Sequence, residues 1–196
     1  MPFRTILSVT APELGNGDLK LAMSLCESIG AHLSVLVVQM AAPPPIGKNA
    51  FVVSELWLRM RQEDEKRLAD KRDEVTRLLA TGRVPGDIAT EHVEFSSSDE
   101  AVGLRGRYAD LTLIGPEVLA AATLRSKVQE GALFSSGRPL LLMPDNAKAT
   151  LTPRRILVAW DASTEASRAI REALDLLVAA DDVRLSSASL GDGAPA

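Results

Sequence analysis

The stretch RTILSVTAPELGNGDLKLAMSLCESIGAHLSVLVVQM, residues 4–40, decides the fold class of this chain. A short apolar, β-rich run at 3–9 comes first, and turn-forming proline and glycine follow it. From Asp18 to Ser28 apolar residues recur at helical spacing, with Asp18 as the expected N-cap. The nearly continuous apolar run from His32 to Met40 is typical of a strand covered on both faces. Strand, helix and strand in this order predict a right-handed βαβ unit.

The same alternation continues along the chain. The further elements expected are a proline-rich loop at 41–50, a long helix at 52–81, strands at 87–95, 110–114 and 139–143, a helix opening at Ser98 and a helix at 122–136. Five strands alternating with helices predict an α/β fold with an open, doubly wound, mostly parallel five-stranded sheet in the Rossmann-like order 3-2-1-4-5. Such sheets bind ligands beyond the carboxyl ends of their strands, here at 10–17 and 115–128.

Two charged residues interrupt the apolar stripe of the long helix. Asp64 and Lys71 fall among Leu56, Trp57, Met60, Leu68 and Val75, which otherwise lie near one helical face. We therefore expect the middle of this helix to be solvated or to lie at the rim of a partner contact.

Composition narrows the function classes. The 196 residues are 46% hydrophobic and 24% charged, which is ordinary for a globular protein, and the net charge is −4. Lys and Arg are scattered, so we expect no nucleic-acid partner. The single cysteine, Cys26, fits a reducing compartment, which favours the cytoplasm. The first apolar run is too short for a signal-peptide core and no run is long enough to span a bilayer, so we expect neither export nor a membrane partner.

An internal repeat follows a polar linker. Arg4, Ile6 and Leu7 reappear as Arg154, Ile156 and Leu157, and the same shift of 150 residues keeps strand on strand and helix on helix. We expect one domain at 1–145 and a partial second βαβ unit at 153–196, whose second strand spans 183–190. Because a single βαβ unit cannot cover both faces of its sheet, this unit is expected to pack on the first domain, to pair with a second chain or to be a truncated copy.

Few side chains indicate chemistry of their own. The two histidines lack neighbours at metal-ligand spacing, so no metal is expected; His32 marks a helix-to-strand turn, and His92 is expected on a strand and facing solvent. Cys26 is interpreted as a core residue. Ser98 is expected to cap the helix that follows it.

Several segments resemble the universal stress protein family. ILVAWDASTEASRAIREAL, at 156–174, is similar to that family's first strand and helix, and ADLTLIGP, at 109–116, to its fourth strand. RSKVQEGALFSSGRPLLLMP, at 125–144, is similar to its last helix and final strand. The resemblance implies a tandem-type member with a degenerate first domain and a truncated second one.

The resemblance also implies where ATP would bind. ATP-binding members carry a Gly-x2-Gly-x9-Gly-Ser/Thr loop, and starting it at Gly115 puts Val118, Val128 and Gln129 at the other three positions. The acidic residue after the first strand would fall at Ala11 in the first copy and at Asp161 in the second. Gly115 and Asp161 are therefore remnant nucleotide-site positions, and no cofactor is expected unless ATP binds in a composite site between chains.

The leading functional hypothesis is a non-catalytic regulatory protein of the stress-response type that forms a homo-oligomer, a dimer, and contacts other proteins. It is not expected to be an enzyme, and no catalytic residue is assigned. The alternative is a nucleotide or small-molecule binding protein, or a weak ATPase, that uses the crevice between the first and fourth strands. A third interpretation is a flavodoxin-like or electron-transfer flavoprotein-like nucleotide domain, which has the same topology, but this sequence contains no glycine-rich phosphate loop for it.

Overall fold

A computed structural model describes residues 3–44, 55–145, 147–148 and 150–187. The chain divides into two compact units, Phe3–Ala149 and Thr150–Ala196, the second of which includes Met1–Pro2. Within the described residues, no helix is both long enough and apolar enough to cross a membrane.

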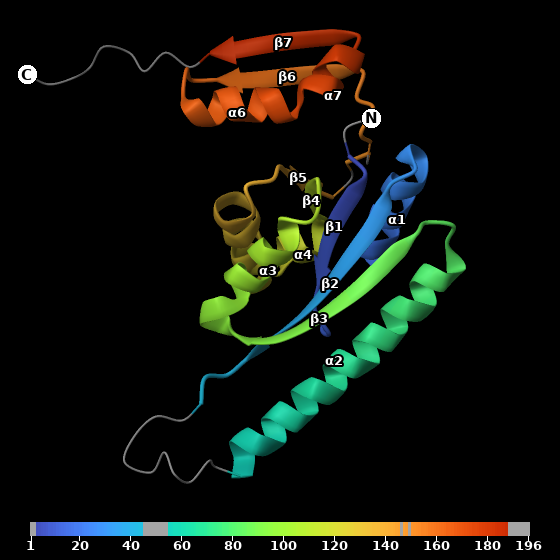
Figure 1. Ribbon diagram of the computed structural model, residues 1–196, viewed down its shortest axis with the longest axis vertical. Helices are drawn as coiled ribbons and strands as arrows, with labels where there is room; N and C mark the ends of the chain where they lie inside the picture. Colours follow the sequence, from blue (N-terminus) through green and yellow to red (C-terminus); the bar gives the residue numbers. More distant parts are fainter. Residues whose placement is uncertain (1–2, 45–54, 146, 149, 188–196) are drawn as a thin grey trace, which may run out of the picture. The chain divides into compact units, whose positions relative to one another are not determined.

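A parallel five-stranded sheet forms the centre of the first unit (Figure 1). Its strands are β1 (Thr5–Thr10), β2 (His32–Ala41), β3 (Gly86–Glu94), β4 (Leu111–Ile114) and β5 (Leu140–Leu142). Their order is β3-β2-β1-β4-β5, and every neighbouring pair is parallel. The predicted α/β class and the predicted order 3-2-1-4-5 are therefore confirmed.

Helices cover this sheet on both faces. They are α1 (Gly17–Ile29), α2 (Glu55–Thr81), α3 (Ser98–Gly106), α4 (Pro116–Ala120) and α5 (Ala122–Glu130), with a 3-10 turn at Phe95–Ser97 and a π-helical turn at Gly131–Ser136. α1 and α2 pack against β1, β2 and β3, whereas α3 contacts the same strands and α5. The expected helix at 122–136 is thus α5 continued by the π-helical turn, and α4 was not predicted. Residues 45–54, which include the first part of the expected helix 52–81, lie outside the described residues.

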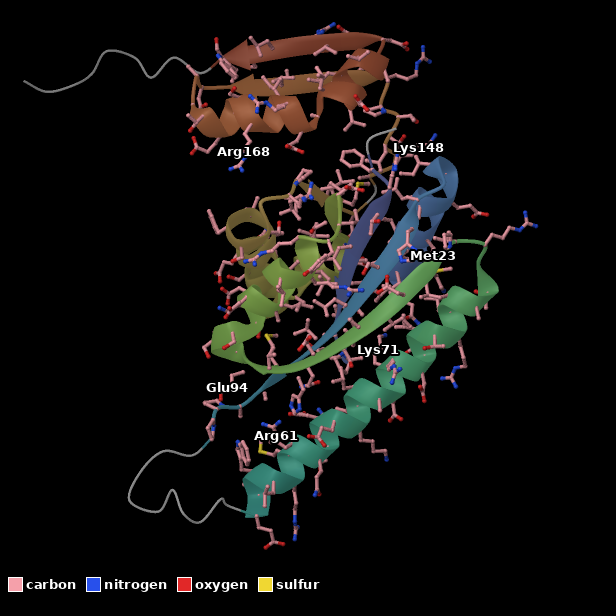
Figure 2. All side chains as sticks on the ribbon, in the orientation of Figure 1. Met23, Arg61, Lys71, Glu94, Lys148 and Arg168 are labelled. Atoms are coloured by element: carbon pink, nitrogen blue, oxygen red, sulfur yellow. The ribbon has the colours of Figure 1, made fainter. Side chains whose placement is uncertain are left out.

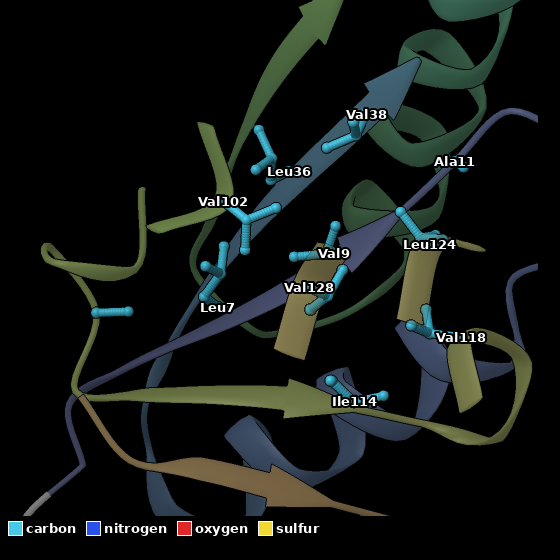
Figure 3. Packing of buried hydrophobic residues seen from close by; sticks show 11 residues of the cluster. Leu7, Val9, Ala11, Leu36, Val38, Val102, Ile114, Val118, Leu124 and Val128 are labelled. Atoms are coloured by element: carbon cyan, nitrogen blue, oxygen red, sulfur yellow. The ribbon is translucent and has the colours of Figure 1, made fainter. Parts of the chain in front are cut away.

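The core explains why β1 and β2 are so apolar. Leu7 and Val9 on β1 pack with Leu36 and Val38 on β2, together with Val102 of α3 and buried residues of α4 and α5 (Figure 3). Residues 6–10 of β1 are all buried, so both faces of this strand are covered. The central strand thereby holds the ends of its neighbours in fixed positions.

The second unit repeats the first strand, helix and strand. It contains β6 (Arg155–Trp160), α6 (Thr164–Glu172), α7 (Leu174–Ala179) and β7 (Asp182–Ser187), and its two strands are parallel. The hydroxyl of Ser163 accepts a hydrogen bond from the Ala166 amide and caps α6. Residues 188–190 of the expected strand at 183–190 lie outside the described residues. Leu157, the counterpart of fully buried Leu7, is 70% exposed.

Candidate functional site at the ends of strands β1 and β4

The ends of β1 and β4 bring two helix N-termini together. β1 and β4 are parallel neighbours, so their carboxyl ends share one edge of the sheet. The loop at 11–16 leads from β1 into α1, while Gly115 alone separates β4 from α4, whose first residue is Pro116. α1 and α4 are in contact. This junction is the place where the sequence predicted a ligand site, at 10–17 and 115–128.

Asp18 is buried at this junction and caps the opposite helix. Its carboxylate accepts hydrogen bonds from the backbone amides of Glu117 and Val118, each at 3.0 Å. Burial raises the pKa of the Asp18 carboxyl, and these two amide hydrogen bonds act in the opposite direction. The expectation that Asp18 caps its own helix is wrong, because Asn16 is the N-cap residue of α1 and Asp18 lies within the first turn.

Glu117 makes the reciprocal contact. Its carboxylate accepts a hydrogen bond from the Gly17 amide at 3.1 Å and a longer one from the Asp18 amide at 3.4 Å. Cβ atoms at Gly15 and Gly17 would lie only 2.5 Å and 2.9 Å from its Oε1 atom, so these glycines leave room for the carboxylate. Exposed amides at a helix N-terminus attract anions. Here the anions that they bind are two carboxylates of the chain itself.

The positions that a glycine-rich phosphate loop would occupy are built differently. Val118 and Val128 are buried members of the hydrophobic core, and Val128 and Gln129 lie within the regular helix α5. A helix satisfies its interior amides with its own carbonyl groups, so these amides are not available to a phosphate. Gly115 is the only one of the four positions that has the family's residue type.

Lys71 on α2 holds the loop between β1 and α1 by hydrogen bonds. It extends from α2, its side chain is 2% exposed, and its Nζ atom donates hydrogen bonds to the carbonyls of Leu14 at 2.7 Å and Gly15 at 3.2 Å (Figure 2). The same atom donates to Oδ1 of Asn16 and lies 3.3 Å from Oε2 of Glu74. The prediction of a solvated helix middle is therefore wrong at Lys71, since the buried ammonium group is paired and fully used for hydrogen bonding.

The remainder of this network involves Glu74. It accepts a hydrogen bond from the side-chain amide of Asn16, and this bond, together with Lys71, lowers the pKa of the Glu74 carboxyl. Asn16 thus links the N-cap of α1 to α2. The loop is held by side chains whose partners lie more than fifty residues away, which no local pattern in the sequence indicates.

A cleft of about 500 Å³ adjoins this network. It lies between the β1–α1 loop, the end of β2 and α2, and its lining residues are Pro12, Glu13, Gln39, Arg67, Asp70, Lys71, Glu74 and Arg77. This volume is within the range of ligand pockets. Its lining mixes cationic and anionic side chains, in contrast to the uniformly cationic lining that favours phosphate groups.

The two remnant positions fall in different units. Gly115 belongs to the first unit, and Asp161 belongs to the second, where it follows β6 and is exposed. Asp161 accepts a hydrogen bond from the Ser163 amide at 3.0 Å, and hydrogen bonds from Ser163 lower the pKa of its carboxyl. This contact is a local turn at the start of α6.

Other candidate residues have structural partners. His32 opens β2, and its Nε2 atom lies 2.7 Å from Oδ1 of Asp87. Cys26 is buried, and burial raises the pKa of its thiol to about 12. Ser98 does not cap α3, because it is the first residue of that helix and its hydroxyl donates a hydrogen bond to the carbonyl of Glu94.

The prediction that His92 faces solvent is wrong, since its side chain is 10% exposed beneath α2. In the described ranges no cluster of three or more His, Cys, Asp or Glu side chains could hold a metal ion.

Comparison with known proteins adds only distant neighbours. No family model matches the chain, and no curated protein matches it. A universal stress family protein from Burkholderia pseudomallei is 21% identical over 72% of this chain and 96% of its own, with a TM-score of 0.40. A putative universal stress protein from Pseudomonas aeruginosa UCBPP-PA14 is 18% identical over 94% of this chain and 60% of its own, with a TM-score of 0.46. A hypothetical protein whose function was assigned from its structure is 13% identical over 76% and 100%, with a TM-score of 0.49.

Proposed function

We propose that residues 3–149 form a non-catalytic regulatory protein of the stress-response type, which acts by binding other proteins and does not hold ATP between β1 and β4. One observation carries this proposal: Asp18 and Glu117 occupy the amides that a phosphate would need. A nucleotide would have to displace two carboxylates, one of them buried, and would meet their negative charge as it approached. The stress-response assignment is supported by the segments at 109–116, 125–144 and 156–174 that resemble the universal stress protein family.

The absence of catalysis in this proposal follows from how the crevice residues are used. A general base or nucleophile must reach a substrate with an unengaged atom. Asp18 and Glu117 accept hydrogen bonds from backbone amides instead, and Cys26 is a buried thiol. No residue of the crevice is therefore assigned a catalytic role.

Isothermal titration of the full chain with Mg-ATP tests this proposal. The wild-type chain is expected to show no binding at micromolar nucleotide. The Glu117→Ala and Asp18→Ala variants serve as sensitised forms, because each exposes amides at one helix N-terminus, and a gain of phosphate or ATP binding would support the proposal. Micromolar binding by the wild-type chain would defeat it. Loss of that binding in Asp161→Ala would then assign it to a composite site.

The second candidate is a small-molecule binding protein that uses the cleft of about 500 Å³. Arg77 lines this cleft, whereas Arg83 follows α2 and is exposed, so Arg77→Ala and Arg83→Ala form a matched pair. A ligand found by screening that binds the wild-type chain and loses affinity only in Arg77→Ala would favour this function. An unchanged affinity in Arg77→Ala would argue against it.

We also propose that the protein is a cytoplasmic homodimer. β5 is an edge strand of the sheet, Leu142 on it is exposed, and Phe134 in the preceding π-helical turn is exposed as well. Exposed apolar side chains near an unpaired strand edge favour self-association. Light scattering should give twice the chain mass, and the double variant Phe134→Ser, Leu142→Lys should give the mass of the monomer.

The proposed cytoplasmic location is supported by the single cysteine, Cys26, which is buried and free, because such a thiol is compatible with a reducing compartment.

A further inference from the structure

His92 occupies an unusual position between β3 and α2. It lies on β3 opposite Gln39 of β2, and its side chain is nine-tenths buried by the helix. Both ring nitrogens, Nδ1 and Nε2, are buried without a hydrogen-bond partner among the described residues. Buried polar atoms in folded proteins are almost always hydrogen-bonded, so the two unpaired nitrogens of His92 call for an explanation.

Two carboxylates from α2 face the ring. Oδ2 of Asp64 lies 3.7 Å from Nε2, and Oε1 of Glu65 lies 4.0 Å from Nδ1. Asp64 is largely buried, whereas Glu65 is mostly exposed. On β2 the cross-strand neighbour Gln39 carries no charge, and on β3 the charged residue on the same face as His92 is Glu94, which is two residues along the strand and exposed.

The protonation state of His92 decides whether these groups attract. A neutral imidazole has one donor and one acceptor, and the acceptor nitrogen cannot bond to a carboxylate. A charged imidazolium has two donors, and each of its nitrogens already has a carboxylate within ion-pair distance. Histidine is the side chain whose charge ordinarily changes between pH 5 and 8.

We propose that His92 is a pH-sensitive lock that holds the N-terminal half of α2 against β3. At acidic pH the charged ring pairs with Asp64 and Glu65, and the helix is fixed over residues 55–66. At alkaline pH the neutral ring has a single N–H donor and no charge, so both ion pairs are lost, at most one carboxylate can still accept a hydrogen bond from the ring, and this half of the helix opens more often. The exposed apolar residues Leu56, Leu58 and Met60 lie on this segment. The lock therefore sets how often the helical segment that carries them opens.

Hydrogen exchange of the full chain tests the lock. Amides in residues 55–66 are expected to show roughly threefold to tenfold higher protection factors at pH 5.5 than at pH 8.0, which corresponds to the formation of one or two ion pairs. Protection factors remove the intrinsic pH dependence of exchange. The pH difference should vanish in His92→Gln and shrink in Asp64→Asn, which alters the helix side of the contact.

His32 provides the matched control, since the chain contains only these two histidines. His32→Gln should retain the full pH difference, because the partner of His32 is Asp87 on β3 and not a residue of 55–66. The proposal is overturned if wild-type protection is independent of pH, if His92→Gln keeps the difference or if His32→Gln abolishes it. Should His92→Gln fail to fold, the Asp64→Asn result decides alone, and an unchanged pH difference there overturns the lock.

Discussion

A Cβ atom added to Gly115 would lie 2.3 Å from Oδ1 of Asp18, a separation that real side chains do not adopt. Asp18 cannot easily move away, because two amides of α4 hold its carboxylate. Glycine at 115 is therefore explained by the carboxylate that it admits, without any phosphate.

This contact predicts the effect of enlarging Gly115. Gly115→Ala should lower the free energy of unfolding by about 1–3 kcal/mol through overpacking, as measured by urea denaturation. Gly82→Ala is the control, because its closest neighbour is the flexible end of Met23. If Asp18→Ala fails to relieve part of the cost in the double variant, the steric explanation is incorrect.

Removing the Glu117 carboxylate should expose the N-terminus of α1. Glu117→Ala is expected to lose about 1 kcal/mol of stability, the usual cost of losing a helix cap. Glu27→Ala, an exposed change on α1 itself, should be neutral in the same thermal melts. Equal melting temperatures for wild type and Glu117→Ala would contradict the capping role.

Replacing Lys71 should loosen the β1–α1 loop. Lys71→Met removes a buried ammonium group and leaves the carbonyls of Leu14 and Gly15 without their donor, so a loss of about 2–4 kcal/mol is expected. Lys66→Met alters an exposed lysine on the same helix and serves as the control. The hydrogen-exchange rates of residues 11–16 should rise in Lys71→Met and not in Lys66→Met. Similar rates in both variants would be evidence that Lys71 does not hold the loop.

The lowered pKa of Glu74 gives a pH dependence with a definite sign. A carboxyl whose pKa is lower in the folded state stabilises the protein above its ordinary value of 4.5, and this contribution is lost as the pH falls through the lowered value. The stability difference between wild type and Glu74→Gln should therefore be present at pH 7 and shrink below pH 4.5. Glu91→Gln, on the exposed side of β3, should show no such change, and a Glu74 difference that grew on acidification would reverse the assignment.

The two copies of the repeat should respond differently to the same truncation. Leu7→Ala removes a fully buried side chain and should cost about 2–5 kcal/mol, whereas Leu157→Ala removes an exposed one and should change stability by less than about 0.5 kcal/mol. Denaturation monitored by circular dichroism measures both. A large loss in Leu157→Ala would mean that its side chain is covered in solution.

The fold could be predicted from the sequence because both faces of the central strands are apolar and the turns carry glycine and proline. The order of the strands follows from right-handed crossovers, and the structure confirms it. α4 was missed, since Pro116–Ala120 is a helix of a single turn without a periodic pattern of its own.

The site was harder to predict because its contacts join residues far apart in the sequence. The partners of Glu117 at 17 and 18 lie a hundred residues away and are visible only once α1 and α4 meet. The sequence pattern predicts that Asp18 caps its own helix, and it shows Lys71 only as a charged residue that interrupts an apolar stripe. His92 gave no local signal, because α2 buries it from a distant part of the chain.

The bond between Lys71 and the loop at 14–16 has a mechanical consequence. An ammonium group on α2, a helix of 27 residues, bonds directly to the loop that leads from β1 into α1. A partner that bound α2 and shifted it at Lys71 would therefore move this loop without contacting it.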